Sequence, residues 1–475
     1  MNAGLNNCRI LLLNPRISGD VRYGKFKSVG SYLPPYGLLS IAGVLEEKGH
    51  IVRVIDADTQ QGLTLDNIRK IIVDFKPDII GMTAYSIARR QVIDTAVFIK
   101  SISPAVIVVG GPHVIVFPED LADCDSIDIL AYGEGEYTMS DIADYYLSLK
   151  DISQIDGILY RKDGQVIKTK NREFISDLDS LPYPAYHLLD NLEDYKPMQL
   201  LYKRLPMVTF ITGRGCPFNC IFCNSIWGKK IRLNSPEYIA GFIRKMVRDH
   251  HIREILFYED TFLIDKKRIE ILCDILINEN IKIVWSCSAN VRTVDKPILL
   301  KMKQAGCWLI SFGIESGNND VLKFIKKPLT VEESRQACRW ANEAGLKIRG
   351  FFIIGHLVDT RQTIRDTINL AKSLPLFTVN ICILQLLPGS KVREIAHDYG
   401  EVNYDLSLGT GHPGDTLSFV PKGLTVEYLH KMQRQAYFEF FVRPVQVWRL
   451  VRSIDSLEDV KKYVVLLRTF LGLYL

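Results

Sequence analysis

The stretch VTFITGRGCPFNCIFCN, residues 208–224, joins a short strand pattern directly to three closely spaced cysteines. Cys216, Cys220 and Cys223 fall on one short loop. Thiolates are the usual ligands of iron–sulfur clusters, and three of them can bind three irons of a four-iron cluster while the fourth iron stays open. Glycines at the start of the loop let the backbone wrap closely around a bulky group. The stretch therefore predicts a 4Fe-4S site directly after a strand.

A zinc ion is the alternative occupant of such a loop. Zinc usually takes four ligands, often as paired Cys-x-x-Cys groups, and no second pair or Cys/His partner lies nearby in this sequence. A tight cysteine group in a long chain without a secretory start indicates metal or cluster binding rather than disulfides. Seven other cysteines are scattered along the chain, and we interpret most of these seven as buried free thiols. They are Cys8, Cys124, Cys273, Cys287, Cys307, Cys338 and Cys382.

Six strand patterns alternate with helix patterns from the cysteine stretch onward. The predicted strands are Val208–Thr212, Glu254–Tyr258, Ile283–Ser288, Trp308–Gly313, Lys347–Ile354 and Phe377–Leu384. The predicted helices are Ser235–Arg248, Lys266–Asn278, Lys296–Ala305, Val331–Ala344 and Thr360–Leu374. Such a series predicts a partial (β/α)6 barrel, in which functional groups gather at the carboxyl ends of the strands.

The chain before residue 150 alternates in the same way. Its predicted strands are Arg9–Leu13, Ile51–Ile55, Ile79–Met82, Val106–Val109 and Ile127–Ala131. Short buried strands that alternate with helices indicate a parallel sheet, and five such units predict a doubly wound, Rossmann-like α/β domain. Ligands in that architecture bind outside the carboxyl ends of the strands.

Two further segments complete the expected organisation. The pair Asp163–Gly164 predicts a hairpin turn, and Leu181–Pro184 indicates an extended linker. Near the C-terminus Thr425 is a suitable N-cap for a helix over Val426–Phe441, which Pro444 interrupts. The sequence therefore predicts four parts: 1–150, a hairpin and linker over 151–200, a barrel over 201–395, and a helical C-terminal region over 396–475.

Composition and charge exclude several classes of protein. The 475 residues carry a net charge of only +5 and no block of Lys or Arg, so we expect no nucleic-acid partner. The N-terminus lacks the pattern of a signal peptide, and no apolar run is long enough to predict a membrane span. We expect a cytoplasmic protein, although the apolar end Leu466–Leu475 is weakly compatible with a membrane surface or a greasy substrate.

From about Val208 to Leu387 the sequence resembles the radical S-adenosylmethionine (SAM) superfamily. The pattern Cys-x-x-x-Cys-x-aromatic-Cys after the first barrel strand carries this resemblance. The later strand ends match in order, at Tyr258–Phe262, Ser286–Arg292, Gly313–Gly317 and Phe351–Gly355. The resemblance implies a 4Fe-4S cluster on the three cysteines and contacts to SAM from Phe222, Glu259, Ser288, Arg292, Glu315 and Gly355. No catalytic residue is assigned.

Each of the later motifs has a structural alternative. Glu259, Asp260 and Glu315 fit solvated loop acids as well, and Arg292 fits a structural ion-pair partner. The turn after Gly355 departs from the Pro-Gly-Glu-like pattern of the family, because it begins with His356. We interpret His356 as structural, with a contact to substrate as the alternative.

The first part of the chain, from about Arg9 to Glu136, resembles the cobalamin-binding domain that precedes many radical SAM barrels. The resemblance implies cobalamin contacts from Tyr36, Gly37, Thr83, Tyr85, Ser86, Gly110, Gly111, Gly133 and Glu134. The alternative is a Rossmann-like domain with ordinary turns. Many cobalamin domains carry a cobalt-ligating histidine after the first strand, but no histidine precedes His50 here. We therefore hypothesise cobalamin bound without a protein histidine below cobalt.

The combined resemblance is to the group of the anaerobic magnesium-protoporphyrin ester cyclase and the hopanoid methylases. It implies that the reduced cluster cleaves SAM to a 5′-deoxyadenosyl radical, which abstracts hydrogen from an unactivated carbon of a small-molecule substrate. Methylcobalamin then delivers a methyl group, and a flavodoxin, ferredoxin or reductase supplies electrons. The substrate classes considered are a lipid, a tetrapyrrole and a natural product. The alternatives are a cyclase or oxidoreductase with the same cofactors, and a non-catalytic cobalamin or iron–sulfur sensor.

Overall fold

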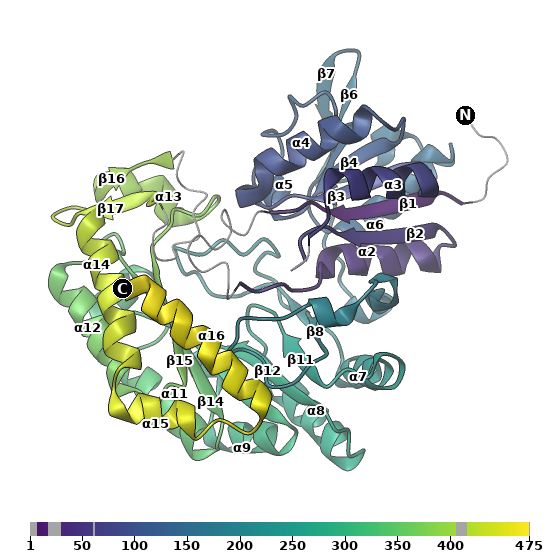
Figure 1. Cartoon of the computed structure of the whole chain (residues 1–475). Coiled ribbons are helices and arrows are strands. Elements are labelled where there is room, and N and C mark those ends of the chain that lie inside the picture. The colour runs from purple at the N-terminus through teal and green to yellow at the C-terminus, as the bar shows by residue number, and fades with distance from the viewer. Residues whose placement is uncertain (1–6, 18–29, 60–61, 405–415, 475) are drawn as a thin grey trace. The chain divides into compact units, whose positions relative to one another are not determined.

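The computed structural model describes residues 7–17, 30–59, 62–404 and 416–474 (Figure 1). The described chain forms two compact units, of which the first includes Tyr32–Tyr195 and the second includes everything described from Lys196 onward. Each unit contains its own large sheet. The finer division into four parts stays a prediction.

The sheet of the first unit has the strand order β2-β1-β3-β4-β5-β6-β7. Strands β1 to β5 are parallel, and the predicted hairpin adds β6 and β7 to the same sheet in antiparallel pairing. The strand bounds are β1 Arg9–Asn14, β2 Ile51–Asp56, β3 Ile79–Thr83, β4 Val106–Gly110, β5 Ile129–Ala131, β6 Ile158–Lys162 and β7 Gln165–Lys168. The predicted doubly wound domain is confirmed.

Helices cover both faces of this sheet. Ile72 of α3 and Val92 of α4 share one buried cluster with Leu11, Ile80 and Ile107 of the strands. On the other face α2 packs against α6, where a Cβ on Gly81 of β3 would meet the Met139 side chain. The helices are α2 Tyr36–Glu47, α3 Leu65–Phe75, α4 Arg89–Lys100, α5 Pro112–Val116 and α6 Gly135–Tyr146. Burial of nearly continuous apolar strands between two helix layers explains why their sequences lack polar alternation.

The second unit contains six parallel strands in the order β15-β14-β13-β12-β11-β8. Each strand pairs with the next one along the chain, and within the described residues β8 and β15 do not pair, so the barrel is open. The strands are β8 Met207–Phe210, β11 Glu254–Phe257, β12 Val284–Ala289, β13 Cys307–Glu315, β14 Lys347–Ile354 and β15 Thr378–Ile383. The predicted partial barrel is confirmed.

Polar N-cap residues start most of the barrel helices. Ser235, Asp265, Asp295, Thr330 and Thr360 each accept a hydrogen bond from a backbone N–H in the first helical turn. The helices are α7 Pro236–His250, α8 Lys266–Asn278, α9 Lys296–Gln304, α10 Asn319–Phe324, α11 Val331–Glu343 and α12 Arg361–Ser373. The short helix α10 was not predicted.

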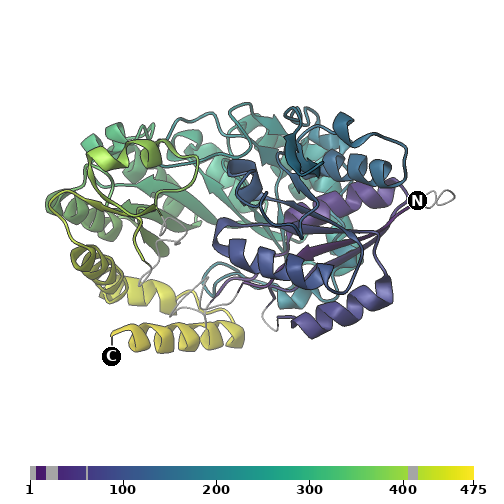
Figure 2. The same cartoon turned by 90° about the horizontal axis from the view of Figure 1, so that it is seen from above.

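One helix of the C-terminal part of the chain covers the open edge of this sheet at β15. The predicted helix α14, Val426–Phe441, is confirmed with Thr425 as its N-cap. Gln433 donates to the Ile381 carbonyl at 2.7 Å, and Tyr437 Oη accepts from the Ile381 N–H at 3.0 Å. Helix α14 contacts β15, and its yellow-green ribbon lies next to the green part of the barrel in both views (Figures 1 and 2). The remaining C-terminal elements are α13 Lys391–Ile395, β16 Gly400–Val402, β17 Phe419–Pro421, α15 Pro444–Val451 and α16 Leu457–Tyr474.

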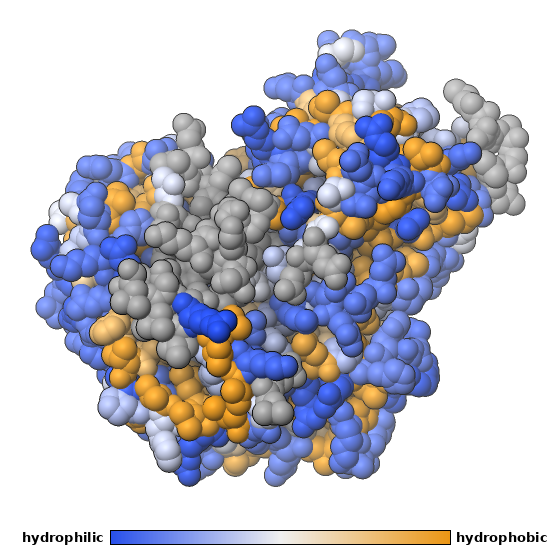
Figure 3. Space-filling view, viewed as in Figure 1, coloured by the Kyte–Doolittle hydropathy of each residue, from blue (hydrophilic) through white to orange (hydrophobic). Residues whose placement is uncertain are grey.

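Several apolar side chains of α15 and its flanks are exposed: Val442, Val445, Val447, Trp448 and Val451. Figure 3 shows an orange surface at the lower left, where Figure 1 places α15. Among the described helices, none combines the length and the apolar character that crossing a bilayer requires. Contact with a membrane surface stays a prediction.

Candidate functional site

The cysteine loop follows β8, at the carboxyl end of the barrel sheet. A two-stranded ribbon, β9 Gly213–Arg214 with β10 Arg232–Leu233, opens and closes the loop. The Cys216 N–H donates to the Gly228 carbonyl at 3.1 Å, and Ile221 N–H donates to the Ile325 carbonyl at 3.0 Å. Gly215 has φ of +96°, and a side chain there would collide with the Lys230 carbonyl. The backbone of the loop is therefore fixed on both sides.

The three thiols lie near enough to influence one another. Burial raises the pKa of Cys220, the charges of Glu315 and Cys216 raise it further, and Lys327 opposes them. Within the described part of the chain, no three His, Cys, Asp or Glu side chains converge on a point that could hold a single metal ion. Three thiolates of a four-iron cluster bind three different irons and do not need such a point. The donor set therefore fits a cluster better than zinc.

A buried ion pair lies behind this loop. Lys327 Nζ is 2.8 Å from Glu315 Oε1, and the two side chains are only 10% and 9% exposed. Burial alone lowers the pKa of Lys327, but the charges of Glu315 and Cys220 outweigh this effect and raise it. A Cβ on Gly313 would lie 2.6 Å from Glu315 Oε1 and 2.9 Å from Lys327 Nζ, so a larger residue there would displace the paired side chains.

Glu259 occupies a different position from Glu315. Its side chain is 2% exposed, and its carboxylate accepts from Thr212 Oγ1 at 2.9 Å. Arg268 lies 3.4 Å from the same carboxylate and also donates to the Thr212 carbonyl at 2.9 Å. Burial raises the pKa of Glu259, against the opposing effects of Arg268 and Thr212. Glu259 thus ties the end of β8 to the start of α8, and its contact with SAM stays a prediction.

The other predicted SAM residues are distributed along the strand ends. Arg292 lies on the surface, 3.2 Å from Glu333, so the structure gives it an ion-pair partner. Ser288 is half-buried at the end of β12, and its carbonyl accepts from Phe262 N–H at 3.2 Å. Asp260 accepts from Ser225 at 3.3 Å. Their direct contacts with SAM stay predictions.

His356 connects the fifth strand end to the cysteine loop. It follows Gly355, which has φ of +79° after β14. The ring of His356 lies 5.8 Å from the ring of Phe222, centroid to centroid, and is fully buried. Neither ring nitrogen has a hydrogen-bond partner among the described residues, and burial lowers the pKa of His356 to about 3. A neutral His356 therefore lies beside Phe222 of the cysteine loop as an internal packing contact.

In the first unit, the predicted cobalamin residues gather at one edge of the sheet. Thr83, Gly110 and Gly133 end or follow the neighbouring parallel strands β3, β4 and β5, and the turn into α2 places Tyr36 and Gly37 after β1. At Gly111, φ is +99°, and a Cβ would lie 2.6 Å from Thr83 Oγ1. Because these glycines have no side chains, a large flat ligand can approach the backbone closely at this edge of the sheet.

Two side chains at this edge are engaged within the protein. Glu134 is buried, and its carboxylate accepts from Ile175 N–H at 2.6 Å. Ser86 Oγ lies 3.1 Å from Nδ1 of His113, whose Nε2 lies 3.0 Å from Asp120. Tyr85 is exposed beside them. The contacts of these residues with cobalamin stay predictions.

Two family models match this chain: the Radical SAM superfamily over residues 210–371 and the B12 binding domain over residues 26–143. An uncharacterised methyltransferase of Pyrococcus horikoshii is 34% identical over 442 residues, which cover 92% of this chain and 93% of that protein. The chain belongs to the radical SAM superfamily, in the group that carries a cobalamin-binding domain. Accordingly, its cofactors are a 4Fe-4S cluster, SAM and cobalamin.

Other radical SAM relatives carry different activities in their names. The anaerobic magnesium-protoporphyrin IX monomethyl ester cyclase of Rubrivivax gelatinosus is 28% identical over 77% of this chain and 65% of that protein. A solved structure of a cobalamin-dependent S-adenosylmethionine radical enzyme, OxsB with aqua-cobalamin and SAM bound, covers 96% of this chain and 70% of that one. Its TM-score is 0.75 at 18% identity, which supports the fold.

The ion-pair partner Lys327 is the site residue of this radical SAM unit that the sequence did not indicate. It follows α10 and Lys326, which has φ of +52°. The only signal was a pair of lysines before Pro328, which is an ordinary surface pattern. The position of Lys327 near the cysteines depends on a backbone hydrogen bond from Ile221 N–H to the Ile325 carbonyl, which holds this segment against the cysteine loop.

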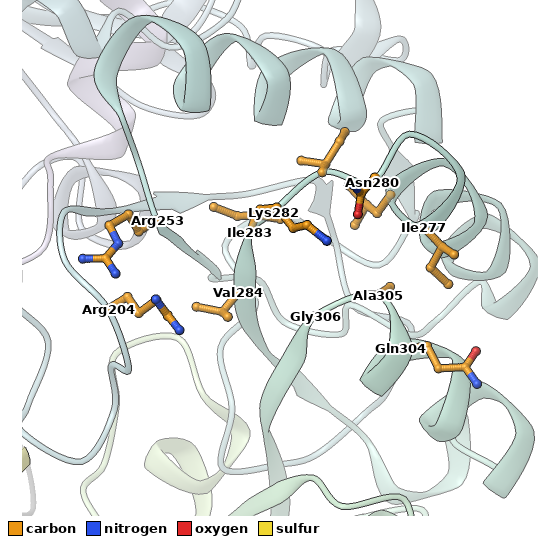
Figure 4. Close-up of a pocket in the computed structure, with 12 residues that line it drawn as sticks. Arg204, Arg253, Ile277, Asn280, Lys282, Ile283, Val284, Gln304, Ala305 and Gly306 are labelled. Atoms are coloured by element: carbon orange, nitrogen blue, oxygen red, sulfur yellow. The ribbon is translucent and has the colours of Figure 1, made fainter. Parts of the chain in front are cut away.

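A hollow of about 440 Å³ lies at the opposite end of the barrel (Figure 4). Arg204, Arg253 and Lys282 line it, together with Ile283 and Gly306, which precede the strands. In barrels of this kind catalytic residues lie at the carboxyl ends of the strands, and residues at the amino ends usually stabilise the fold. We therefore do not assign the radical SAM reaction to this hollow.

Proposed function

We propose that this chain is a cobalamin-dependent radical SAM methyltransferase that methylates an unactivated carbon of a small-molecule substrate. The observation that carries the proposal is the 34% identity to a protein named as a methyltransferase, which extends over 92% of this chain and so includes both units. The cysteine triad is complete, and this supports catalysis over a sensor without turnover. The substrate is either a lipid, a tetrapyrrole or another natural product.

In the proposed enzyme, Cys216, Cys220 and Cys223 hold the cluster. Lys327 lies close to these thiols, and we propose that its ammonium group pairs with the carboxylate of SAM. Glu315 is proposed to accept hydrogen bonds from the amino or hydroxyl groups of SAM. When bound, the cluster and SAM supply a carbon-centred radical, and cobalamin supplies a methyl group. The protein's contribution is to orient these groups and to exclude water.

The half-buried Phe222, which His356 packs against, and the strand end at Gly355 are proposed to contact the adenine ring of SAM. In the first unit, we propose that cobalamin binds at the sheet edge formed by Thr83, Gly110, Gly111 and Gly133. Residues from Thr83 to Arg89 are proposed to lie under the corrin. The electron donor is proposed to be a flavodoxin, a ferredoxin or a dedicated reductase.

A second function is favoured by a specific observation. The magnesium-protoporphyrin ester cyclases also match, at 28% identity over 77% of the chain for the Rubrivivax protein. A cyclase or oxidoreductase would use the same cofactors and the same three cysteines. The two activities differ in the fate of SAM, because only methyl transfer consumes a second SAM molecule.

The test is anaerobic reconstitution with iron, sulfide and cobalamin, followed by reductant and SAM, with products identified by mass spectrometry. Formation of both 5′-deoxyadenosine and S-adenosylhomocysteine supports the methyltransferase. Deoxyadenosine without S-adenosylhomocysteine, with candidate substrates of each class present, favours the cyclase or oxidoreductase. If neither product forms on a protein with a full cluster, the proposal of an enzyme is wrong.

A further inference from the structure

Arg349, near the middle of β14, lies on the less covered face of the barrel sheet. Alternate residues of β14 are buried, namely Ile348, Gly350, Phe352 and Ile354. The residues between them are half-buried, namely Lys347, Arg349, Phe351 and Ile353. A Cβ on Gly350 would meet the Leu376 side chain at 2.9 Å, which shows how tightly the buried face is packed. Because side chains alternate along a strand, Arg349 points to the other face.

The strand register places a row of polar residues beside Arg349. Arg349 pairs with Ser311 of β13 and with Thr378 of β15, and Ser311 pairs with Ser288 of β12. Neighbours in register on parallel strands point to the same face of a sheet. The inner face of the barrel therefore carries one layer of three hydroxyl groups and a single guanidinium.

Among the residues that the structure describes, none provides a counter-ion for Arg349. Among the described residues, its guanidinium makes no hydrogen bond and no ion pair, and its one ring contact is with Phe351, 4.4 Å from the ring centre. The ionisable groups that act on it are Tyr437, Cys382 and Tyr258, none of which is a carboxylate. Burial lowers the pKa of Arg349. An arginine stays protonated even so, and a charge withdrawn from water without a partner is destabilising.

We propose that Arg349 binds an anionic group of the substrate, a carboxylate or a phosphate, inside the barrel. This inference rests on the proposed function, because it assigns the substrate class of the same enzyme. The planar guanidinium can donate two parallel hydrogen bonds to such a group, and the neighbouring Ser288, Ser311 and Thr378 offer further donors. The substrate then supplies the counter-ion that the described residues do not provide.

The position of Arg349 distinguishes its ligand from SAM. Its register partner Ser311 lies four residues before Glu315 on β13, which is roughly 13 Å at the usual rise of a strand. Lys327, which pairs with Glu315, is the cation whose charge acts on Cys220 and Cys223. Lys327 is therefore suited to the carboxylate of a cluster-bound SAM, and Arg349 lies deeper in the barrel.

The test uses the reconstituted holoenzyme, oxidised and saturated with SAM, with inorganic phosphate as the probe and acetate as a second probe in a separate titration. Calorimetry measures the dissociation constant of each anion for the wild type, R349Q, R349K and R253Q. Arg253 is the matched control, because it lines the hollow at the other end of the barrel. We expect at least one of the two anions to bind the wild type, about tenfold or more weaker binding to R349Q, an intermediate value for R349K, and no change for R253Q.

The anion that loses affinity in R349Q identifies the group as phosphate or carboxylate. Three results overturn the inference: neither anion binds the wild type; R349Q binds both anions as tightly as the wild type, whatever R253Q does; or R349Q, still folded by circular dichroism, binds SAM more weakly by a similar factor. The last result would assign Arg349 to the cofactor. Deoxyadenosine formation by the wild type tests the proposed function separately, so the two can fail independently.

Discussion

At Glu315 the fourth barrel strand ends with φ of +67° and a buried ion pair to Lys327. Removing one partner of a buried pair leaves the other charge unpaired and costs about 3–5 kcal/mol. We therefore expect Lys327→Met to lower the free energy of unfolding by about 3 kcal/mol, and Glu315→Gln in the same chain to recover part of the loss. Urea denaturation followed by tryptophan fluorescence measures this, because all five tryptophans lie in the second unit.

The control for this prediction is an ion pair of similar length on the surface. Lys296 Nζ lies 2.7 Å from Glu343, with both side chains 49% exposed. A double-mutant cycle on that pair is expected to give about 0.2–1 kcal/mol. Equal coupling energies for the two pairs would show that burial of Glu315 and Lys327 has no energetic role.

His356 predicts a pH dependence of stability. Burial lowers the pKa of His356 from its ordinary value of 6.5 to about 3 in the folded protein. Between these two pH values the unfolded chain binds a proton at His356 and the folded chain does not. The His356 contribution is therefore absent above about pH 6.5, and it destabilises the fold increasingly as pH falls from there toward 3. The expected slope approaches about 1.4 kcal/mol per pH unit.

Urea denaturation at several pH values compares the wild type with His356→Leu, which should lack this slope. His397→Gln is the control, because His397 is exposed beside Asp398. Identical pH profiles for the wild type and His356→Leu would contradict a neutral, partnerless imidazole.

At the scale of elements, the edge of the barrel sheet depends on side chains of α14. Tyr437 Oη accepts the Ile381 N–H at 3.0 Å. Tyr437→Phe removes this acceptor, so we expect the Ile381 amide to exchange about fivefold faster, since one hydrogen bond contributes about 1 kcal/mol. Hydrogen–deuterium exchange with mass spectrometry measures it, and Tyr428→Phe on the same helix is the control. No change in the β15 peptide would mean that α14 does not protect this edge.

Most elements were predictable because their periodicity is local. The helix over 266–278 and the strand over 347–354 have the bounds that the sequence indicates, and the other barrel strands differ by one or two residues at their ends. The helix α10 was missed because its six residues are too few for an apolar stripe to repeat. The attachment of the hairpin to β5 was also missed, because strand pairing is a contact between distant segments.

At the scale of the whole molecule, the two proposed cofactor sites use residues of different units. The triple variant Cys216→Ala, Cys220→Ala, Cys223→Ala is expected to lose its iron and its visible cluster absorbance but to retain cobalamin at the wild-type ratio. Metal analysis of the purified, reconstituted protein measures both. Cys338→Ala, which changes a buried thiol of α11, should retain both metals. Iron retained by the triple variant would contradict the assignment of the cluster.

Cobalamin is expected to bind without a histidine below cobalt. Both ring nitrogens of His113, the histidine nearest in sequence to the sheet edge proposed for cobalamin, are engaged by Ser86 and Asp120. The electron paramagnetic resonance spectrum of the bound Co(II) form should therefore show no splitting from a histidine nitrogen. A nitrogen splitting that disappears in His113→Ala would overturn this expectation.

The sequence by itself determined the cysteine loop, the two alternating series of strands and helices, and through them the family and its cofactors. These features are contiguous or periodic, so they are visible without knowledge of distant contacts. Only the tertiary structure decided that Lys327 pairs with Glu315, that Glu259 is held by Arg268 and Thr212, and that Arg349 has no counter-ion among the described residues. The physical reason is that the role of a charge depends on what lies within a few ångströms of it, and strand register and burial fix those neighbours.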